Sequence, residues 1–324
     1  MKVVSDPNRT RVVWSDGHKL WQHDIPSGRQ EPLSLRIEAP VVQVYSSGHG
    51  HFSVGHYFAS QRFEVTVHDF TEPSEVKARA VLDPGGNKLE GDITSWSEVP
   101  LVNVVEYFHG PRIGSYFFEI RPDCGQVQLQ RIEWYDDSYD KGYENINSVL
   151  RLGREALAVV SVTRRSELIL HDLNTGGKVG TVPLPGGVAG GARPLLLHNA
   201  EQEIWTVNYD TMVVVRRSDW QILRSSRLQL TDSPRSRLFV GDFSFAPDEE
   251  LCVVARPYSG DILGLDVSTL EVKYVAKLGQ QPLNVVALPG REVLAFDWRT
   301  EALLRGKLRP LAREDDIRVL MDPI

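Results

Sequence analysis

Cysteine is scarce in this chain, which has only Cys124 and Cys252 among its 324 residues. Two isolated cysteines provide neither a disulfide framework nor a paired-cysteine metal site. The N-terminal stretch MKVVSDPNRTRVVW lacks the apolar core of a signal peptide, and no apolar run approaches the roughly 18 residues that a membrane-spanning helix needs. We therefore expect a cytoplasmic protein that does not bind membranes.

Positive charge is also in deficit, because 36 Lys and Arg face 43 Asp and Glu and leave a formal net charge of −7. Nonspecific binding to nucleic acid depends on a positive surface, so a nucleic-acid partner is not expected. Helical periodicity is nearly absent, and the best candidate is a short turn around Leu311 to Asp316. With 41% hydrophobic residues the chain can still build a core, so strands must supply it.

A strand-turn motif recurs along the chain, and the strand of each copy ends at an aspartate: Asp24, Asp69, Asp172 or Asp266. The copies read LWQHDIPSGRQ, VTVHDFTEPSEV, ILHDLNTGGKV and ILGLDVSTLEV, at steps of 45, 103 and 94 residues. The two long steps are each about twice the short one, and each contains a degenerate copy, with Arg121 or Arg217 in the Asp position. A further copy, ALLRGKLRPL, follows Asp266, which makes seven units of about 46 residues.

Each unit divides into four short strands, and the sixth shows this most clearly as LFVGDFSFAP, ELCVVARPYS, DILGLDVS and EVKYVAKL. Four strands per unit and a period in the forties indicate a β-propeller. We predict a single all-β domain, a seven-bladed β-propeller of four-stranded antiparallel blades. The predicted blades are residues 1–38, 39–82, 89–136, 146–185, 192–230, 237–278 and 282–324.

The phrase FAPDEELCVVARPYSGDILGLDVST resembles the repeats of WD-repeat and YVTN-type propellers, and the resemblance covers essentially the whole chain. His23, His68 and His171 stand where those repeats have the Trp of the Trp-Asp dipeptide. The Gly-His pairs of that family do not recur at the corresponding positions. The resemblance therefore implies a propeller fold rather than a particular activity.

The order of the strands also predicts how the ring closes. The first unit begins with its innermost strand, so we expect no strand exchange between the termini and closure by face packing alone. The outer strand of the last blade would then be DIRVLM, Asp316 to Met321. The alternative is a rearranged last blade, because Pro310 interrupts the strand sequence before it.

Histidines form two patterns. His49, His51 and His56 are weak candidates for a metal site, because no Cys or acidic ligand lies nearby in the sequence. The His-Asp pairs are expected to be structural, since neighbouring residues of a strand point to opposite faces and the Asp can fix the turn that follows. We predict no metal, no cofactor and no catalytic residue.

Two surfaces are candidates for binding. One is the insertion Glu133 to Ile146, where acidic residues alternate with Trp134, Tyr135, Tyr139 and Tyr143; its D-x-S-x-D start departs from a calcium loop at the later ligand positions. The other is the rim formed by the hairpins between second and third strands. Its candidate residues are Arg62, Arg112, Arg164, Arg165, Tyr209, Tyr258, Trp298 and Arg299.

We predict a non-catalytic module that binds a protein or peptide on this rim and is a monomer by itself. The alternative is a propeller enzyme of the lactonase, lyase or hydrolase type with its site at the central channel. The innermost strands offer only His198, Asp242 and Asn284 for that chemistry. No nucleophile elbow, phosphate-binding loop or paired-carboxylate motif is present.

Overall fold

The computed structural model describes seventeen stretches of the chain. They are residues 3–16, 19–35, 41–46, 50–57, 63–82, 89–94, 101–107, 112–121, 126–135, 146–152, 156–162, 165–186, 195–198, 200, 202–228, 240–248 and 250–311.

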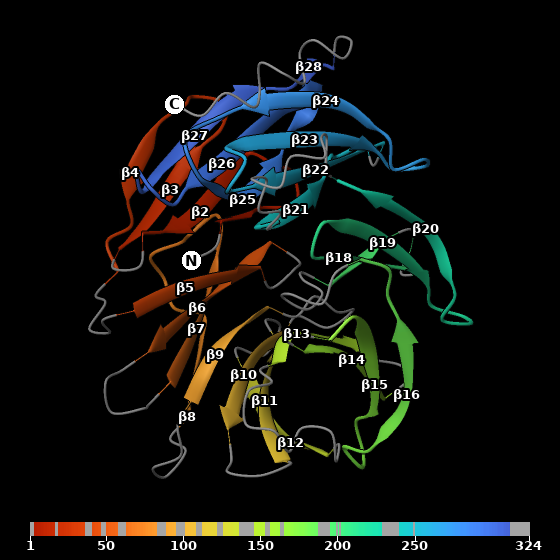
Figure 1. Cartoon of the computed structure of the whole chain (residues 1–324). Coiled ribbons are helices and arrows are strands. Elements are labelled where there is room, and N and C mark those ends of the chain that lie inside the picture. The colour runs from red at the N-terminus through yellow and green to blue at the C-terminus, as the bar shows by residue number, and fades with distance from the viewer. Residues whose placement is uncertain are drawn as a thin grey trace.

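The described strands form seven antiparallel sheets, each a meander of consecutive strands, arranged around a common centre (Figure 1). Blades one to three are β1(Val3–Ser5), β2(Arg11–Ser15), β3(Leu20–Asp24), β4(Gln30–Pro32); β5(Val41–Ser46), β6(His51–Tyr57), β7(Phe63–Asp69), β8(Ala78–Leu82); β9(Leu89–Thr94), β10(Leu101–Tyr107), β11(Arg112–Arg121), β12(Gln126–Tyr135). Blades four to six are β13(Ile146–Leu152), β14(Leu157–Val162), β15(Glu167–Asp172), β16(Lys178–Pro183); β17(Leu196–His198), β18(Glu203–Asn208), β19(Thr211–Arg216), β20(Ile222–Arg227); β21(Asp242–Phe245), β22(Leu251–Arg256), β23(Asp261–Asp266), β24(Val272–Lys277). The closing sheet is β25(Pro282–Ala287), β26(Glu292–Asp297) and β27(Ala302–Lys307).

The number of complete blades differs from the prediction. Six sheets contain four or more strands, whereas the closing sheet has three within the described residues, so there are six complete blades rather than seven. After β27 the chain leaves this sheet, and β28(Arg309–Pro310) pairs instead with β24 of blade six. Pro310 has no N–H to donate, which restricts it to the edge of a sheet.

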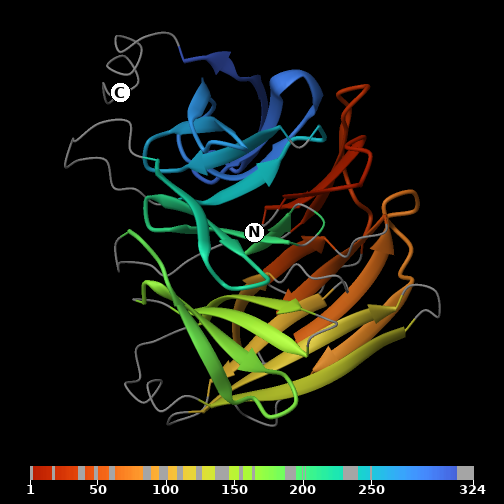
Figure 2. The ribbon, with the colours of Figure 1, turned by 90° about the vertical axis from the view of Figure 1, so that its right-hand side faces the viewer.

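The middle strands are buried in the blades whose side chains the structure describes, because neighbouring blades cover both of their faces. All six residues of β22 are buried, whereas β20 is mainly exposed or half-buried. Apolar clusters fill the spaces between consecutive blades: Val213 and Leu168 belong to the cluster between blades four and five, and Trp205 and Val254 to the next one. The side view in Figure 2 shows the sheets as twisted layers around the centre.

Side chains of blade one and the closing sheet pack against each other, and closure without strand exchange between the termini stays a prediction. Trp14 contacts Phe296, with ring centroids 5.4 Å apart, and stacks on Trp21 at 5.6 Å. Arg305 of β27 donates a hydrogen bond to the carbonyl of Ile25 at 3.0 Å. Within the described residues, no strand of blade one pairs with the closing sheet. The predicted outer strand, Asp316 to Met321, lies outside the described residues.

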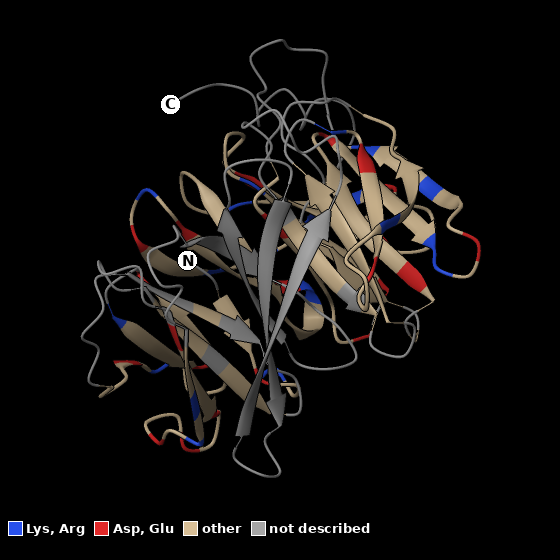
Figure 3. Ribbon diagram, turned by 90° about the horizontal axis from the view of Figure 1, so that it is seen from below, with Lys and Arg blue, Asp and Glu red and all other residues tan. Residues whose placement is uncertain are grey.

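The sole helical segment among the described residues is the 3-10 turn η4(Pro289–Arg291). In that part of the chain, no helix has the length and apolar character that a bilayer crossing requires. Charged residues of both signs are mixed along the ends of strands and the turns (Figure 3).

The closing contact makes a stability prediction. Phe296 is 1% exposed, so Phe296→Ala leaves a cavity at the seam and should lower the free energy of unfolding by about 3–5 kcal/mol. Val179→Ala, at an exposed position on β16, should change it by less than about 0.5 kcal/mol. Urea unfolding followed by tryptophan fluorescence measures both variants, and equal midpoints for the two would contradict closure through this packing.

Candidate functional site

The recurring aspartates fix the turns that follow them, as predicted. Asp172 accepts the backbone N–H groups of Asn174 and Thr175 at 2.9 and 2.8 Å. Asp24, Asp69 and Asp266 make the corresponding contacts with Ser27, Thr71 and Ser268. The hydroxyl of Ser27 acts first in lowering the pKa of Asp24, and the hydroxyl of Thr71 does so for Asp69. The pKa of Asp266 is lowered first by the Lys273 ammonium and then by the Ser268 hydroxyl. The aspartates are therefore structural.

The histidines of the same pairs are buried and are also structural. His171 donates its Nδ1 hydrogen to the carbonyl of Gly176 at 2.9 Å, across the turn that Asp172 holds. His68 Nε2 and His56 Nε2 both contact the Thr66 hydroxyl, at 2.8 and 3.1 Å. A hydroxyl can donate one hydrogen bond and accept another, so Thr66 can pair with the Nε2 atoms of both rings.

The histidine metal site predicted as a weak candidate is not assembled by the described residues. His51 and His56 lie at opposite ends of β6, roughly 16 Å apart at about 3.3 Å per residue, and on opposite faces. His51 faces Asp69, with Nε2 and Oδ2 3.8 Å apart. His49 lies outside the described residues. Within the described part of the chain, no group of three His, Cys, Asp or Glu could hold a metal ion.

Burial of His68 predicts a pH dependence of stability. Burial lowers the pKa of His68 from 6.5 to about 4, so the unfolded chain binds this proton more readily than the folded one. Stability should therefore fall as the pH drops from 6.5 towards 4, by up to about 3 kcal/mol from this group. His68→Gln should flatten the change over that window, as measured by urea unfolding at pH 7, 5.5 and 4.5. An unchanged slope would show that other groups cause it.

The last residue of the second strand binds the preceding interblade link in three consecutive sheets. An interblade link is the segment from the outer strand of one blade to the first strand of the next. Asn208 Nδ2 donates to the Pro185 carbonyl at 2.8 Å, and Arg256 Nη1 donates to the Leu228 carbonyl at 2.7 Å. Asp297 accepts the N–H groups of Gln280 and Gln281. All three side chains are buried. Sequence reasoning missed them, because three different residue types occupy equivalent positions.

Asp297 joins the link after blade six to a hairpin tip. Its other oxygen accepts the N–H groups of Arg299 and Thr300, both at 2.9 Å. Burial acts to raise the pKa of Asp297, but the backbone N–H groups of Gln281, Thr300 and Gln280, with the Thr300 hydroxyl, outweigh burial and hold the pKa below its usual value. A glycine is required at position 279. Its φ of 78° lies in the left-handed region, and an added Cβ would collide with the Asp297 carboxyl. The link is therefore held in one conformation.

Two exposed aromatic residues flank this link on neighbouring hairpins. Tyr258, between β22 and β23, is 60% exposed, and Trp298, between β26 and β27, is 53% exposed. Trp298 donates its backbone N–H to the Gln281 carbonyl at 3.0 Å. A Cβ on Gly260 would lie 3.2 Å from the Gln280 carbonyl, so the Tyr258 hairpin also lies against the link. With the exposed Arg299, these two residues form what we call the aromatic rim.

Buried ionic contacts hold the base of the Tyr258 hairpin. Arg256 binds Asp261 with two hydrogen bonds, Nε to Oδ1 at 2.7 Å and Nη2 to Oδ2 at 2.5 Å. Both side chains are at most 6% exposed. A paired and fully hydrogen-bonded guanidinium of this kind fixes geometry well, because its planar fork matches the carboxylate. The aromatic rim is thus presented on a rigid base.

The other residues predicted for the rim are placed differently. Arg165 is ion-paired with Glu167 at 3.3 Å and its side chain is only 13% exposed. Tyr209 is half-buried in a tight hairpin with φ 60°. Arg112 is the first residue of β11, paired with Tyr135 of β12, rather than part of a turn. Arg62 and Arg164 lie outside the described residues.

The predicted acidic and aromatic insertion is shorter than the sequence suggested. Glu133, Trp134 and Tyr135 belong to strand β12, where Trp134 pairs with Ile113. Large side chains continue to alternate to the end of β12. The acidic residues that follow Tyr135 hid the end of this strand in the sequence. Tyr139 and Tyr143 lie outside the described residues, so a binding role for this segment stays a prediction.

The channel candidates come together only in part. Asn284 Nδ2 donates to Asp242 Oδ2 at 3.2 Å, joining the innermost strands of blade six and the closing sheet. His198 stacks on Phe245 instead, with ring centroids 4.0 Å apart. Burial raises the pKa of the Cys252 thiol, which disfavours a reactive thiolate.

The chain is a β-propeller built from small antiparallel four-stranded sheets. Its fold is similar to the β-propeller domain of Cps50 (Swd1) from Myceliophteria thermophila, with a TM-score of 0.64 and 8% identity over 94% of both chains. It is also similar to a chain of the mitotic checkpoint complex, with a TM-score of 0.63 and 10% identity over 95% of this chain and 90% of that one. These neighbours are WD40 propellers, and at such identities they show the fold alone. No protein-family model and no curated protein sequence matches the chain.

The contacts of Asp297 predict its importance for stability. Asp297→Asn places an amide N–H₂ or a weaker acceptor opposite four backbone donors, so the free energy of unfolding should fall by about 2–4 kcal/mol. Asp219→Asn is the matched control, because its ion pair with Arg216 is exposed and should contribute less than about 1 kcal/mol. Chemical denaturation compares the two. Equal effects would show that the Asp297 contacts add nothing beyond a surface ion pair.

Proposed function

We propose that this propeller is a non-catalytic interaction module that binds a protein partner through the aromatic rim. One observation carries the proposal. Among the exposed large hydrophobic residues of the described chain, only Tyr258 and Trp298 are aromatic, and they lie on adjacent hairpins. Tyr and Trp are the residue types that most often dominate binding energy in protein interfaces.

The rigidity of the rim supports this role. A binding surface that is already ordered loses less conformational entropy when a partner docks. The aromatic residues stand on hairpins fixed by Asp297 and by the Arg256–Asp261 pair, so little ordering is left for the partner to impose. Arg299 adds a planar guanidinium beside them, which can pair with a partner carboxylate.

The structural neighbours support an interaction role, since one of them is a chain of the mitotic checkpoint complex. A cytoplasmic location and a monomeric state remain predictions of this proposal. The channel enzyme is a weaker alternative. Its one supporting observation is Asn284 Oδ1, a buried oxygen without a hydrogen-bond partner among the described residues, on an innermost strand.

The experiment compares the full chain with two double variants in affinity capture from the source cells, followed by titration of the captured protein. Tyr258→Ala with Trp298→Ala should weaken partner binding by at least about 30-fold, the loss of roughly 2 kcal/mol expected of interface anchors. Val179→Ala with Ile222→Ala removes exposed apolar side chains from outer strands and is the matched control.

Control binding should equal that of the unchanged chain. If both double variants bind alike, the rim is not the docking surface. A small-molecule turnover that Asn284→Ala abolishes, with no captured protein, would favour the channel enzyme instead.

A further inference from the structure

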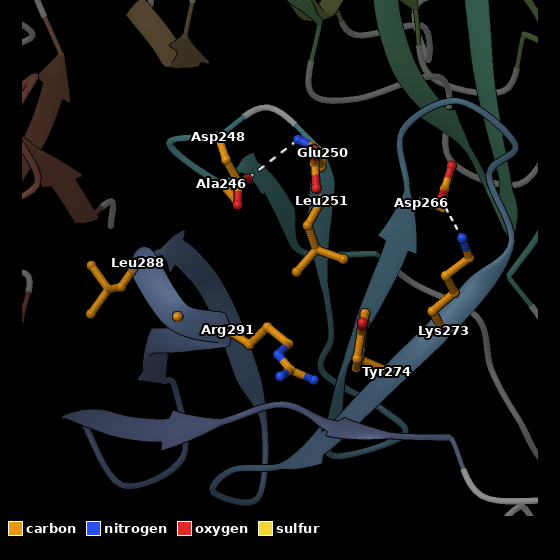
Figure 4. A pocket seen from close by; sticks show the side chains of 10 residues that line it. Ala246, Asp248, Glu250, Leu251, Asp266, Lys273, Tyr274, Leu288 and Arg291 are labelled. Atoms are coloured by element: carbon orange, nitrogen blue, oxygen red, sulfur yellow. Dashed lines mark hydrogen bonds and ion pairs between the residues drawn. The ribbon is translucent and has the colours of Figure 1, made fainter.

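A pocket lies at the opposite end of the propeller from the aromatic rim, between blade six and the closing sheet (Figure 4). It is formed by the β21–β22 loop, the β23–β24 turn and η4, and it encloses about 420 Å³. These loops join first to second and third to fourth strands, so in a meander they lie at the other ends of the strands from the hairpins of the rim. Its volume is within the range of pockets that hold small ligands or short peptide segments.

Part of the lining of the pocket is apolar. Leu251 lines it and is 8% exposed, whereas Leu288 is only 2% exposed and packs mainly into the core with Trp14. Tyr274 of β24 forms one side and is packed against the core beneath it, where a Cβ on Gly264 would lie 3.0 Å from the Tyr274 Cβ. These surfaces can accept one apolar side chain of a ligand.

One cation of the pocket lacks a carboxylate partner. The guanidinium of Arg291 lies over the Tyr274 ring, 5.2 Å from its centroid, and makes no ion pair within the described part of the chain (Figure 4). Lys273, the other cation, is bound to Asp266. Stacking on an aromatic face leaves the edge of a guanidinium open for two parallel hydrogen bonds to a carboxylate.

The backbone holds Arg291 in this position. Its φ is 66°, the left-handed region, which is costly for a residue with a side chain. The Arg291 carbonyl accepts the Leu308 N–H at 2.9 Å, and Glu292 N–H bonds to the Pro289 carbonyl. The turn therefore fixes the backbone of Arg291, and the Tyr274 ring contacts its guanidinium.

Acidic side chains line the other end of the pocket. Asp248 and Glu250 lie on the β21–β22 loop, across the pocket from Arg291 (Figure 4). The Glu250 backbone N–H donates a hydrogen bond to Asp248 Oδ1 at 3.3 Å, which leaves acceptor capacity on both carboxylates. They would repel a second negative group and attract a positive one.

We propose that this pocket binds a peptide segment in which one apolar side chain stands between an acidic and a basic side chain. The acidic side chain pairs with Arg291, the apolar one packs on Leu251 and Tyr274, and the basic one approaches Asp248 and Glu250. This site is separate from the aromatic rim, and it does not depend on the function proposed for the rim.

The test selects ligands from a phage-displayed random heptapeptide library on the full chain and measures the selected synthetic peptides by fluorescence anisotropy. We expect a class of peptides with an acidic and a basic residue flanking an apolar one. Arg291→Gln should weaken these peptides at least about tenfold, and Arg291→Lys less, because an ammonium cannot form the paired hydrogen bonds. Arg29→Gln, at an exposed ion pair on blade one, should leave them unchanged.

A second variant guards against a folding defect at position 291. Glu250→Lys lies in an exposed loop and should shift selection to peptides without the basic residue. Peptides that lose binding in the Tyr258→Ala and Trp298→Ala chain belong to the rim and are set aside. The proposal is overturned if no selected peptide depends on Arg291, if those that do lack an acidic residue, or if Glu250→Lys leaves the selected sequences unchanged.

Discussion

From blade four to the closing sheet, hydrogen bonds bind each interblade link to the hairpin that follows it. This described part of the ring depends on these hydrogen bonds. Neighbouring blades of a propeller pack through apolar faces. These contacts are nondirectional, so by themselves they would let one blade slide along the next. Asn208, Arg256 and Asp297 supply the direction, because each fixes the backbone that leaves the preceding blade. Being buried, these groups would be costly to leave unpaired, so each blade keeps one register relative to its neighbour.

The same contacts connect stability with the candidate site. Asp297 binds the link on one side and the Trp298 hairpin on the other, and the Arg256–Asp261 pair supports the Tyr258 hairpin. Function-bearing side chains are thus attached to the most constrained backbone of the ring. At the opposite end, η4 fixes the backbone of Arg291, and the ring of Tyr274 lies beneath its guanidinium.

Much of the fold could be predicted from the sequence, because repetition and turn chemistry are local. The phrase ending in Asp172 indicated both the strands and the role of the carboxylate. Pro310 indicated a rearranged last blade only as the alternative, and its pairing with β24 could not be predicted, since that pairing depends on an edge in a neighbouring sheet. Arg165 is less exposed than its position at a hairpin suggests, because its burial and its ion pair with Glu167 arise from the tertiary fold. The hairpin positions of Tyr258, Trp298 and Arg299 could be predicted, because turns follow local sequence, and their binding role stays a prediction.

Hydrogen exchange on the Asp297→Asn chain tests the central claim most directly, because it reports the order of single backbone amides. If the carboxylate holds the link and the hairpin together, the amides of Gln280, Gln281, Arg299 and Thr300 should exchange faster, while protection around Asn208 in blade five stays unchanged. Unchanged protection at those four amides, or a loss spread evenly over all blades, would contradict the account.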